Sequence, residues 1–357
     1  MKIPRTIAAA LGLMLTALGT AALAQPLEFR VNPDWPQLPL GDNWLTGGLG
    51  GMCVDARDHV YLLNRQNVVE DDLDGARLAP PIIELNPAGE VVRGWGDPDL
   101  LGGRLHDCHA DAEGNLWIVA SATGHIQKYD PSDGSLLLQV GESGRFDSSD
   151  GTRQGEPLNS DRAQFFLPSA IDTDGEGDIY VADGELPGGN TRIAVLDHEG
   201  NFLRQWRLRR EPGEEDIVVL PHCLRVSDDG LVYVCDRRAD RIQVFDREGE
   251  FQRHIPVDFA PMTDPDGRAS GARGTAVVLD FSPDQEQRHI YVVNQNSVTV
   301  DVIDRESGAR LASFGGGPGR YPGQFELPHG IGVDSRGNVY IAEQEGRRIQ
   351  QFVPVAP

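Results

Sequence analysis

Residues 327–344 of the chain read LPHGIGVDSRGNVYIAEQ, and this stretch decides the fold. A short apolar run, an Asp-x-x-Gly-Asn turn and a second apolar run follow one another, which is the pattern of a β-hairpin with two buried strands. Five more copies, at roughly 50- to 60-residue intervals, lie at residues 50–65, 105–121, 167–184, 220–237 and 275–294. A hairpin repeated at this period indicates a repeat architecture in which equivalent positions recur around a common axis.

The repeats continue into third strands, as in RIQVFD at 241–246, and several into fourth strands, as in SLLLQVG at 135–141. Four strands in each of six units predict an all-β, six-bladed β-propeller built from NHL-like repeats. The last copy lacks an obvious fourth strand, and residues 27–35, LEFRVNPDW, are expected to supply it and close the ring. A β-helix or a sandwich would explain neither the four-strand unit nor this closure. Three polar, Gly-rich inserts are expected to form loops over one face: 66–81, 142–161 and 259–274.

The first 24 residues have the pattern of a secretion signal. Lys2 and Arg5 precede an apolar stretch of small residues that ends in Ala22-Leu23-Ala24, which favours cleavage before Gln25. We therefore predict a signal peptide at 1–24, a single propeller domain at 25–357, and a secreted or periplasmic location.

The composition is strongly acidic. The formal net charge of −23 becomes −25 without the signal, since the signal holds two basic residues and no acidic ones. Such a charge disfavours nucleic acid and anionic membranes as partners, because both present phosphates that would be repelled. We expect a monomer whose partner is a small molecule or peptide carrying a carboxylate.

Four cysteines are present, and no CxxC motif suggests thiol-based zinc binding or redox chemistry. Disulfides are plausible in an oxidising compartment. Cys223 and Cys235 flank one predicted hairpin and could face each other across it, which would leave Cys53 and Cys108 for each other. Four buried free thiols are the alternative.

Three histidines occupy the same slot of the repeat: His106, His222 and His329 each lie eight residues before the glycine of the turn. The first strand of each blade lines the central channel, so this slot lies at one mouth of it. The other copies hold Gly50, Ser169 and a position near Thr275. A single such histidine would be a capped turn residue, but three imidazoles with an open fourth position are a common catalytic zinc arrangement. Iron, nickel or copper would also accept these ligands.

Arg65 and Arg237 share a second slot, at the end of the second strand, which points toward the same mouth. An arginine there can bind a carboxylate through two parallel hydrogen bonds or stabilise developing negative charge. Glu185 has the equivalent place in the third unit and could act as a base. Surface salt bridges for the arginines and a solvated carboxylate for Glu185 are the alternatives.

With its secretion signal, NHL-type repeat and three LPH-like slots, the chain resembles the lyases that cleave peptidyl-α-hydroxyglycine, the second half of peptide C-terminal amidation. The resemblance covers nearly the whole of residues 25–357 and implies a six-bladed propeller whose zinc is held by one histidine from each of three blades. The matching ligands here are His106, His222 and His329. The arginines of the substrate site match Arg65 and Arg237.

Two positions depart from that family. A catalytic tyrosine follows the Asp-Gly of the third unit in the family, whereas this chain has Glu185; Tyr321 could reach the mouth from its loop instead. The family also holds a structural calcium with an aspartate after the last histidine, where this chain has Gly330.

The sequence thus predicts a secreted, zinc-dependent lyase that cleaves an α-hydroxyglycine-type C–N bond to give an amide and glyoxylate. Arg65 and Arg237 would hold the carboxylate, with Glu185 as the base. Two alternatives stay open: a metal-dependent propeller hydrolase or lactonase, and a non-catalytic NHL binding module.

Overall fold

A computed structural model describes residues 27–258 and 274–355 of the chain. The signal peptide expected at 1–24 and nearly all of the insert at 259–274 lie outside these residues. Within the described residues, no helix is long and apolar enough to cross a membrane.

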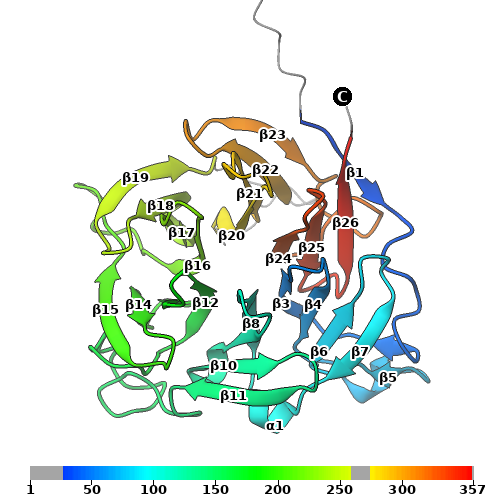
Figure 1. Cartoon of the computed structure of the whole chain (residues 1–357), viewed down its shortest axis with the longest axis horizontal. Coiled ribbons are helices and arrows are strands. Elements are labelled where there is room, and N and C mark those ends of the chain that lie inside the picture. The colour runs from blue at the N-terminus through cyan, green and yellow to red at the C-terminus, as the bar shows by residue number, and fades with distance from the viewer. Residues whose placement is uncertain (1–26, 259–273, 356–357) are drawn as a thin grey trace, which may run out of the picture.

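Six four-stranded antiparallel sheets are arranged around a central axis, as Figure 1 shows. The predicted six-bladed β-propeller is confirmed. The first blade comprises β3 (Leu49–Val54), β4 (Val60–Asn64), β6 (Ile82–Leu85) and β7 (Val91–Trp95), and the second β8 (Leu105–Ala110), β9 (Leu116–Ala120), β10 (His125–Asp130) and β11 (Ser135–Val140). The third comprises β12 (Pro168–Thr173), β13 (Ile179–Asp183), β14 (Arg192–Leu196) and β15 (Phe202–Arg207), and the fourth β16 (Pro221–Val226), β17 (Val232–Asp236), β18 (Arg241–Phe245) and β19 (Phe251–Pro256). The fifth comprises β20 (Ala276–Phe281), β21 (His289–Asn294), β22 (Thr299–Asp304) and β23 (Arg310–Phe314).

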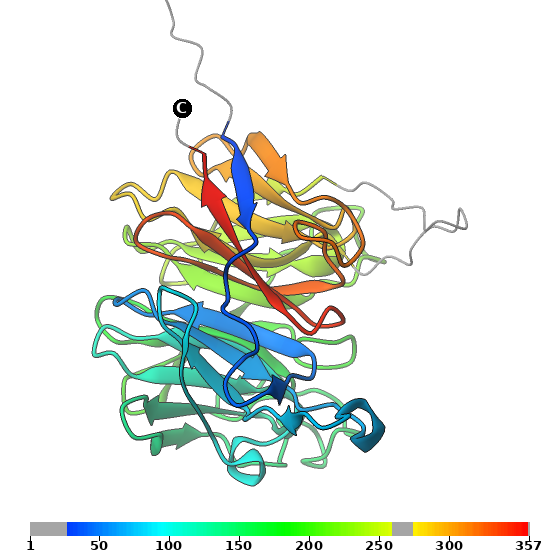
Figure 2. The ribbon, with the colours of Figure 1, turned by 90° about the vertical axis from the view of Figure 1, so that its right-hand side faces the viewer.

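The sixth blade closes the ring with strands from both ends of the chain. It comprises β24 (Pro328–Val333), β25 (Val339–Glu343), β26 (Ile349–Pro354) and, as predicted from the sequence at 27–35, β1 (Phe29–Asn32). Strand β1 pairs antiparallel with β26, with Phe29 opposite Pro354, and the two strands lie side by side in Figure 2. Each innermost strand contacts the next, and β24 contacts β3. The pairing covers the outer edge of β26 and makes β1 the outermost strand of this blade.

The Asp-x-x-Gly-Asn turn is repeated because its aspartate joins the turn to the second strand. In the sixth blade, Oδ1 of Asp334 accepts hydrogen bonds from the amides of Arg336 and Asn338. Its Oδ2 accepts from the hydroxyl of the buried Tyr340 at 2.9 Å. Asp111 binds the amides of its own turn in the same way, with Trp117 in place of the tyrosine. One carboxylate therefore satisfies the turn amides and the polar end of a core aromatic.

Two disulfides link the cysteines in the predicted pairs. Cys223 lies directly opposite Cys235 in the β16–β17 hairpin, with Cα atoms 4.9 Å apart. Cys53 of β3 is bonded to Cys108 of β8, so this bridge joins the innermost strands of neighbouring blades. No described cysteine is free.

Some short elements lie outside the blades. The insert at 66–81, expected to be a loop, contains the 3-10 turn η1 (Glu70–Asp72) and the strand β5 (Arg77–Leu78), which pairs in parallel with β2 (Trp44–Leu45). A single turn of helix, α1 (Pro98–Leu101), precedes the second blade, and the turns η2 (Ser121–Thr123) and η3 (Arg237–Ala239) follow β9 and β17.

Candidate metal centre

The three slot histidines meet at the central axis. Each is the second residue of an innermost strand, in β8, β16 and β24, so the histidines come from alternate blades. Their potential ligand atoms all lie within 4.8 Å of one another, and their ring centroids are 4.8 to 5.2 Å apart. All three side chains are buried, at 2 to 5 % exposure.

A β-bulge aims each histidine inward. The pairing register of every innermost strand shifts at the slot, for example between Leu105 and Cys108 in β8 and between Pro328 and Gly330 in β24. A bulge adds an unpaired residue to one strand and turns its side chain out of the normal alternation. The repeat therefore carries the same inward-turning position in every blade.

The other nitrogen of each histidine is held by the next blade. Nδ1 of His106, His222 and His329 donates to the carbonyl oxygens of Ser169, Val277 and Gly50, at 2.6, 2.7 and 2.8 Å respectively. A carbonyl oxygen can only accept, so each Nδ1 carries a hydrogen, and the Nε2 of a neutral ring presents a lone pair to the axis. Val277 is thus the slot residue of the fifth blade, and the position near Thr275 expected from the sequence is two residues too early.

Electrostatics keep at least two of the rings neutral. Burial, then the charges of Arg237 and His106, lowers the pKa of His222 well below its usual value. Burial, then the charges of His106 and Arg65, does the same to the pKa of His329. Neutral imidazoles with inward lone pairs are the form that binds a transition metal.

The residues at the axis fit a metal ion. Nε2 of His106 is buried and makes no hydrogen bond of normal geometry within the described part of the chain. Three imidazole nitrogens match the donor set of zinc, and iron, nickel and copper accept the same ligands.

The two predicted arginines flank the histidines. Nε of Arg65 donates to the carbonyl of Leu105 at 3.1 Å, while its Nη2 is buried without a hydrogen-bond partner among the described residues. Burial and the nearby charge of Arg104 lower the pKa of Arg65 to about 10, so Arg65 stays charged at neutral pH. Arg237 donates from Nη1 to Nε2 of His222 at 3.0 Å and from Nη2 to Oε1 of Gln295 at 2.6 Å.

Glu185 lies beside the histidines and is 1 % exposed, contrary to the alternative of a solvated carboxylate. Its Oε1 lies 2.5 Å from Nη2 of Arg104 and 3.2 Å from Nε2 of His106. Its Oε2 accepts from the hydroxyl of Ser121 at 2.7 Å. Burial alone would raise the pKa of Glu185, but His106 and Arg104 outweigh it and hold the pKa well below its usual range. The carboxylate therefore stays ionised.

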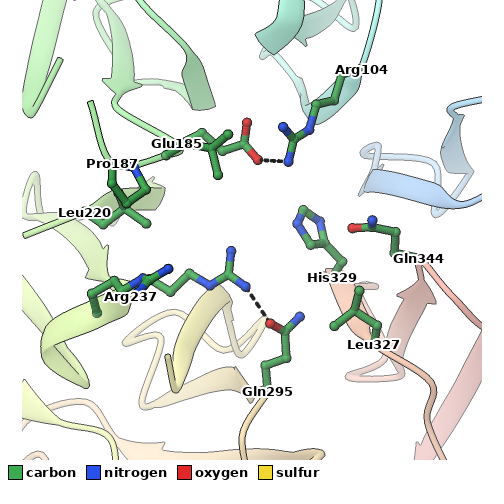
Figure 3. A pocket seen from close by; sticks show the side chains of 11 residues that line it. Arg104, Glu185, Pro187, Leu220, Arg237, Gln295, Leu327, His329 and Gln344 are labelled. Atoms are coloured by element: carbon green, nitrogen blue, oxygen red, sulfur yellow. Dashed lines mark hydrogen bonds and ion pairs between the residues drawn. The ribbon is translucent and has the colours of Figure 1, made fainter. Parts of the chain in front are cut away.

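A cavity of about 570 Å³ opens above the axis, and Figure 3 shows His329, Glu185 and Arg237 at it. Part of the cavity wall is apolar and is formed by Leu186, Pro187, Leu220 and Leu327. Tyr321 is not among its lining residues, and its side chain is 79 % exposed. In this structure Tyr321 therefore does not take the place of the tyrosine that the resemblance implied.

Four polar residues at the site were not singled out from the sequence: Arg104, Ser121, Gln295 and Gln344. Gln295 and Gln344 follow the second strands of their blades, in the slot of Arg65 and Arg237, so the repeat register could have found them. Arg104 stands where two other blades have Leu220 and Leu327.

Gly330, where the resemblance implied a calcium-binding aspartate, is tightly packed. A Cβ at this position would lie 3.1 Å from Cβ of Ala342 and from Cγ of Met52. Within the described chain, this position therefore offers neither a carboxylate nor space for one.

Comparison with known proteins agrees with this architecture. Residues 219–245, which span the β16–β17 hairpin and β18, match the family model of the NHL repeat. The chain is a six-bladed propeller with an NHL repeat at residues 219–245.

This propeller resembles peptidyl-α-hydroxyglycine α-amidating lyases over most of its length. It is 25 % identical to peptidyl-α-hydroxyglycine α-amidating lyase 1 of Drosophila melanogaster, over 89 % of this chain and 58 % of the relative. It is 26 % identical to peptidyl-glycine α-amidating monooxygenase B of Xenopus laevis, over 93 % of this chain. The chain spans only 36 % of the length of that Xenopus protein.

Two further similarities concern the propeller itself. NHL repeat-containing protein 3 of Homo sapiens is 25 % identical, over 93 % of this chain and 86 % of the relative. The structure of a streptogramin B lyase superimposes with a TM-score of 0.53 and 13 % identity, over 92 % of this chain and 98 % of that one. At this identity the structural match shows the fold alone.

Proposed function

We propose that this protein is an exported, metal-dependent lyase that cleaves α-hydroxyglycine-type compounds to an amide and glyoxylate. One observation carries the proposal: three histidines meet at the axis with an arginine on either side, beside a cavity that His329 and Arg237 line. The similarity to amidating lyases supports the reaction class. The two disulfides support an oxidising, extracytoplasmic location.

His106, His222 and His329 would hold the metal, with zinc the expected ion. A bound zinc ion would supply Lewis acidity to the hydroxyl or carbonyl oxygen of the substrate. Their Nδ1 contacts with backbone carbonyls fix the ring orientation, as the outer hydrogen bonds of metal-bound histidines do. We include no calcium ion at Gly330 in this proposal.

Arg65 and Arg237 would bind the substrate carboxylate. Both are charged, and the free Nη2 of Arg65 is a buried donor in need of an acceptor. Arg237 donates to the lone pair of His222 that a metal ion would use, so we expect its guanidinium to turn toward the substrate when the metal is bound. Two guanidinium groups at one carboxylate would fix its position and orientation.

Cleavage requires one proton to leave and one to arrive. The hydroxyl oxygen loses its proton, the C–N bond breaks as the C=O bond of glyoxylate forms, and the amide nitrogen gains a proton. Glu185 is the carboxylate closest to the histidines, and its position permits two roles: acceptor of the hydroxyl proton or ligand of the metal.

The test is metal analysis of the purified protein followed by an assay for glyoxylate. We expect about one transition-metal ion per chain and release of glyoxylate from an N-acyl-α-hydroxyglycine that stops on chelation and returns with zinc. Bound metal without any glyoxylate release would contradict the lyase and favour the hydrolase, which an ester or lactone assay would then detect.

A non-catalytic binding module is the second candidate. The similarity to NHL repeat-containing protein 3 favours it, because the match covers nearly all of both chains and that name includes no reaction. Under either proposal we expect a monomer that binds a small molecule or peptide carrying a carboxylate, and neither nucleic acid nor membrane.

A further inference from the structure

We infer that Glu185 is a fourth protein ligand of the metal, so that the donor set is three histidines and one glutamate. The inference rests on the proposed metal site but not on the lyase reaction. It departs from the role of base that the sequence suggested for Glu185.

The contact between Glu185 and His106 requires a cation. Nδ1 of His106 carries a hydrogen because it faces the carbonyl of Ser169, and in the neutral ring Nε2 presents its lone pair to Oε1 of Glu185 at 3.2 Å. Two atoms with lone pairs at this distance repel each other unless a positive charge lies against both. A proton would relieve the repulsion of this one pair only, whereas a metal ion would also bind His222 and His329.

The distance also fits two ligands of one ion. Zinc lies about 2.0–2.2 Å from imidazole nitrogens and carboxylate oxygens, so ligand atoms on one ion are about 2.8 to 3.6 Å apart for angles between 90° and the tetrahedral value. The 3.2 Å between Oε1 and Nε2 falls inside this range.

The carboxylate is held in the orientation that a ligand needs. Ser121, which is fully buried, donates to Oε2, and the Arg104 guanidinium pairs with Oε1. Outer hydrogen bonds of this kind orient the carboxylates that bind metals. Ser121 holds Oε2, so Oε1, which also pairs with Arg104, is the oxygen that faces His106.

The local backbone delivers Glu185 to the ring. Gly184 has φ +154°, and a Cβ there would lie 2.0 Å from the carbonyl oxygen of Asn190. Only glycine fits this turn, which ends strand β13 and brings the next residue in over the mouth of the channel. Arg65 and Arg237 follow their strands directly, whereas in this blade the polar side chain comes one residue later.

A fourth protein ligand changes which ions suit the site. Four-coordinate zinc with four protein ligands has no open position, as in structural zinc sites. Substrate binding to a three-histidine, one-glutamate centre therefore requires five or six ligands in total. Iron, nickel and cobalt adopt such coordination in imidazole and carboxylate surroundings.

The experiment measures the binding of Co²⁺ and Zn²⁺ to the apo form of the full-length protein, by competition with a chelator and by the visible spectrum of bound Co²⁺. We compare wild type with Glu185→Gln, which keeps the shape and removes the charge, and with Glu185→Asp, which keeps the carboxylate. Glu199→Gln is the matched control, because Glu199 is an exposed carboxylate of the same blade.

We expect Glu185→Gln to weaken Co²⁺ binding by at least about 100-fold, beyond the range for outer-sphere partners, and to shift the spectrum toward fewer ligands. Ser121→Ala should weaken binding by about 10- to 100-fold with the spectrum retained. Glu185→Asp should recover part of the affinity, and Glu199→Gln should match wild type. Thermal unfolding of each apo variant checks the fold.

An unchanged Co²⁺ affinity and spectrum in folded Glu185→Gln would overturn the inference. If that variant loses metal while wild type releases no glyoxylate, the ligand assignment stands and the proposed lyase reaction fails. If wild type releases glyoxylate and Glu185→Gln binds Co²⁺ normally, the reaction stands and the ligand assignment fails. If wild type binds neither ion, both are overturned.

Discussion

Nδ1 of His329 donates a hydrogen bond of 2.8 Å to the carbonyl oxygen of Gly50, across 279 positions of sequence. The contact joins the last blade to the first and also sets the tautomer of one proposed metal ligand. His106 and His222 make the same contact with their own neighbouring blades. Closure of the ring and orientation of the site therefore depend on the same type of bond.

Gly184→Ala should damage the site through the backbone. The new Cβ would meet the carbonyl of Asn190 at 2.0 Å, and the φ of +154° is strained for alanine, so Glu185 must move. We expect a loss of about 1–3 kcal/mol in the free energy of unfolding and weaker binding of metal. Chemical denaturation and Co²⁺ titration measure these effects.

Gly175→Ala is the matched control for this change, since its Cβ would meet nothing within 4 Å in the same blade. Equal stability and metal affinity in both variants would show that the turn at Gly184 has no part in placing Glu185.

Arg65→Gln should weaken recognition of the carboxylate. A charge-assisted hydrogen bond contributes about 1.5–3 kcal/mol, so kcat/KM for a carboxylate substrate should fall by about 10- to 100-fold. Steady-state kinetics with a matched pair of substrates, one with the carboxylate and one with a neutral amide, measure this effect. Arg145→Gln, at an exposed ion pair with Glu142, serves as control. An equal loss for both substrates would mean that Arg65 does not bind the carboxylate.

The two disulfides should differ in their contribution to stability. Cys53 and Cys108 are 55 positions apart and Cys223 and Cys235 only 12, and a longer closed loop restricts the unfolded chain more. Loop entropy gives about 4 kcal/mol for the first and about 3 kcal/mol for the second. Denaturant unfolding of the two double Cys→Ala variants compares them. A larger loss from the Cys223–Cys235 pair would contradict this order.

Asp280 should make stability depend on pH. Burial outweighs the attraction of Arg225 and raises the pKa of Asp280 to about 6. Between the unfolded pKa of about 3.9 and about 6, the unfolded chain releases this proton while the folded chain keeps it. Asp280 therefore stabilises the folded protein below about pH 4. Its contribution to the free energy of unfolding falls as the pH rises from about 4 through about 6 and is constant above that.

Oδ1 of Asp280 accepts from the amide of Phe281 and Oδ2 from the amide of Val333; Asp280→Asn keeps one of these oxygens and removes the titrating proton. The unfolding free energy of Asp280→Asn minus that of wild type should rise by roughly 3 kcal/mol between pH 4 and 7 and then level off. Denaturant unfolding at a series of pH values measures this difference. A difference independent of pH would be inconsistent with the raised pKa.

The repeat register predicted most of the fold and the convergence of the three histidines. His106, His222 and His329 could be placed because each stands at a fixed distance from a turn glycine, and a closed ring converts that distance into a shared position. The closing strand near the N-terminus followed from the missing fourth strand of the last blade. Both are consequences of symmetry, which the sequence carries in full.

The remaining features depend on packing that the register does not encode. In the fifth blade, no Leu-Pro pair precedes the first strand, so the sequence did not mark the slot residue. The structure places Val277 there. Glu185 follows a turn glycine and resembles a surface acid in sequence, yet Arg104 from the preceding blade and Ser121 bury it. Such contacts between blades cannot be read from one repeat.

Anomalous X-ray scattering from crystals grown with Zn²⁺ or Co²⁺ tests the central metal site most directly. We expect one strong peak on the axis, about 2.0–2.2 Å from Nε2 of His106, His222 and His329, with Oε1 of Glu185 at a similar distance. Protein crystallised with either ion that shows no peak among the three Nε2 atoms would contradict the metal centre.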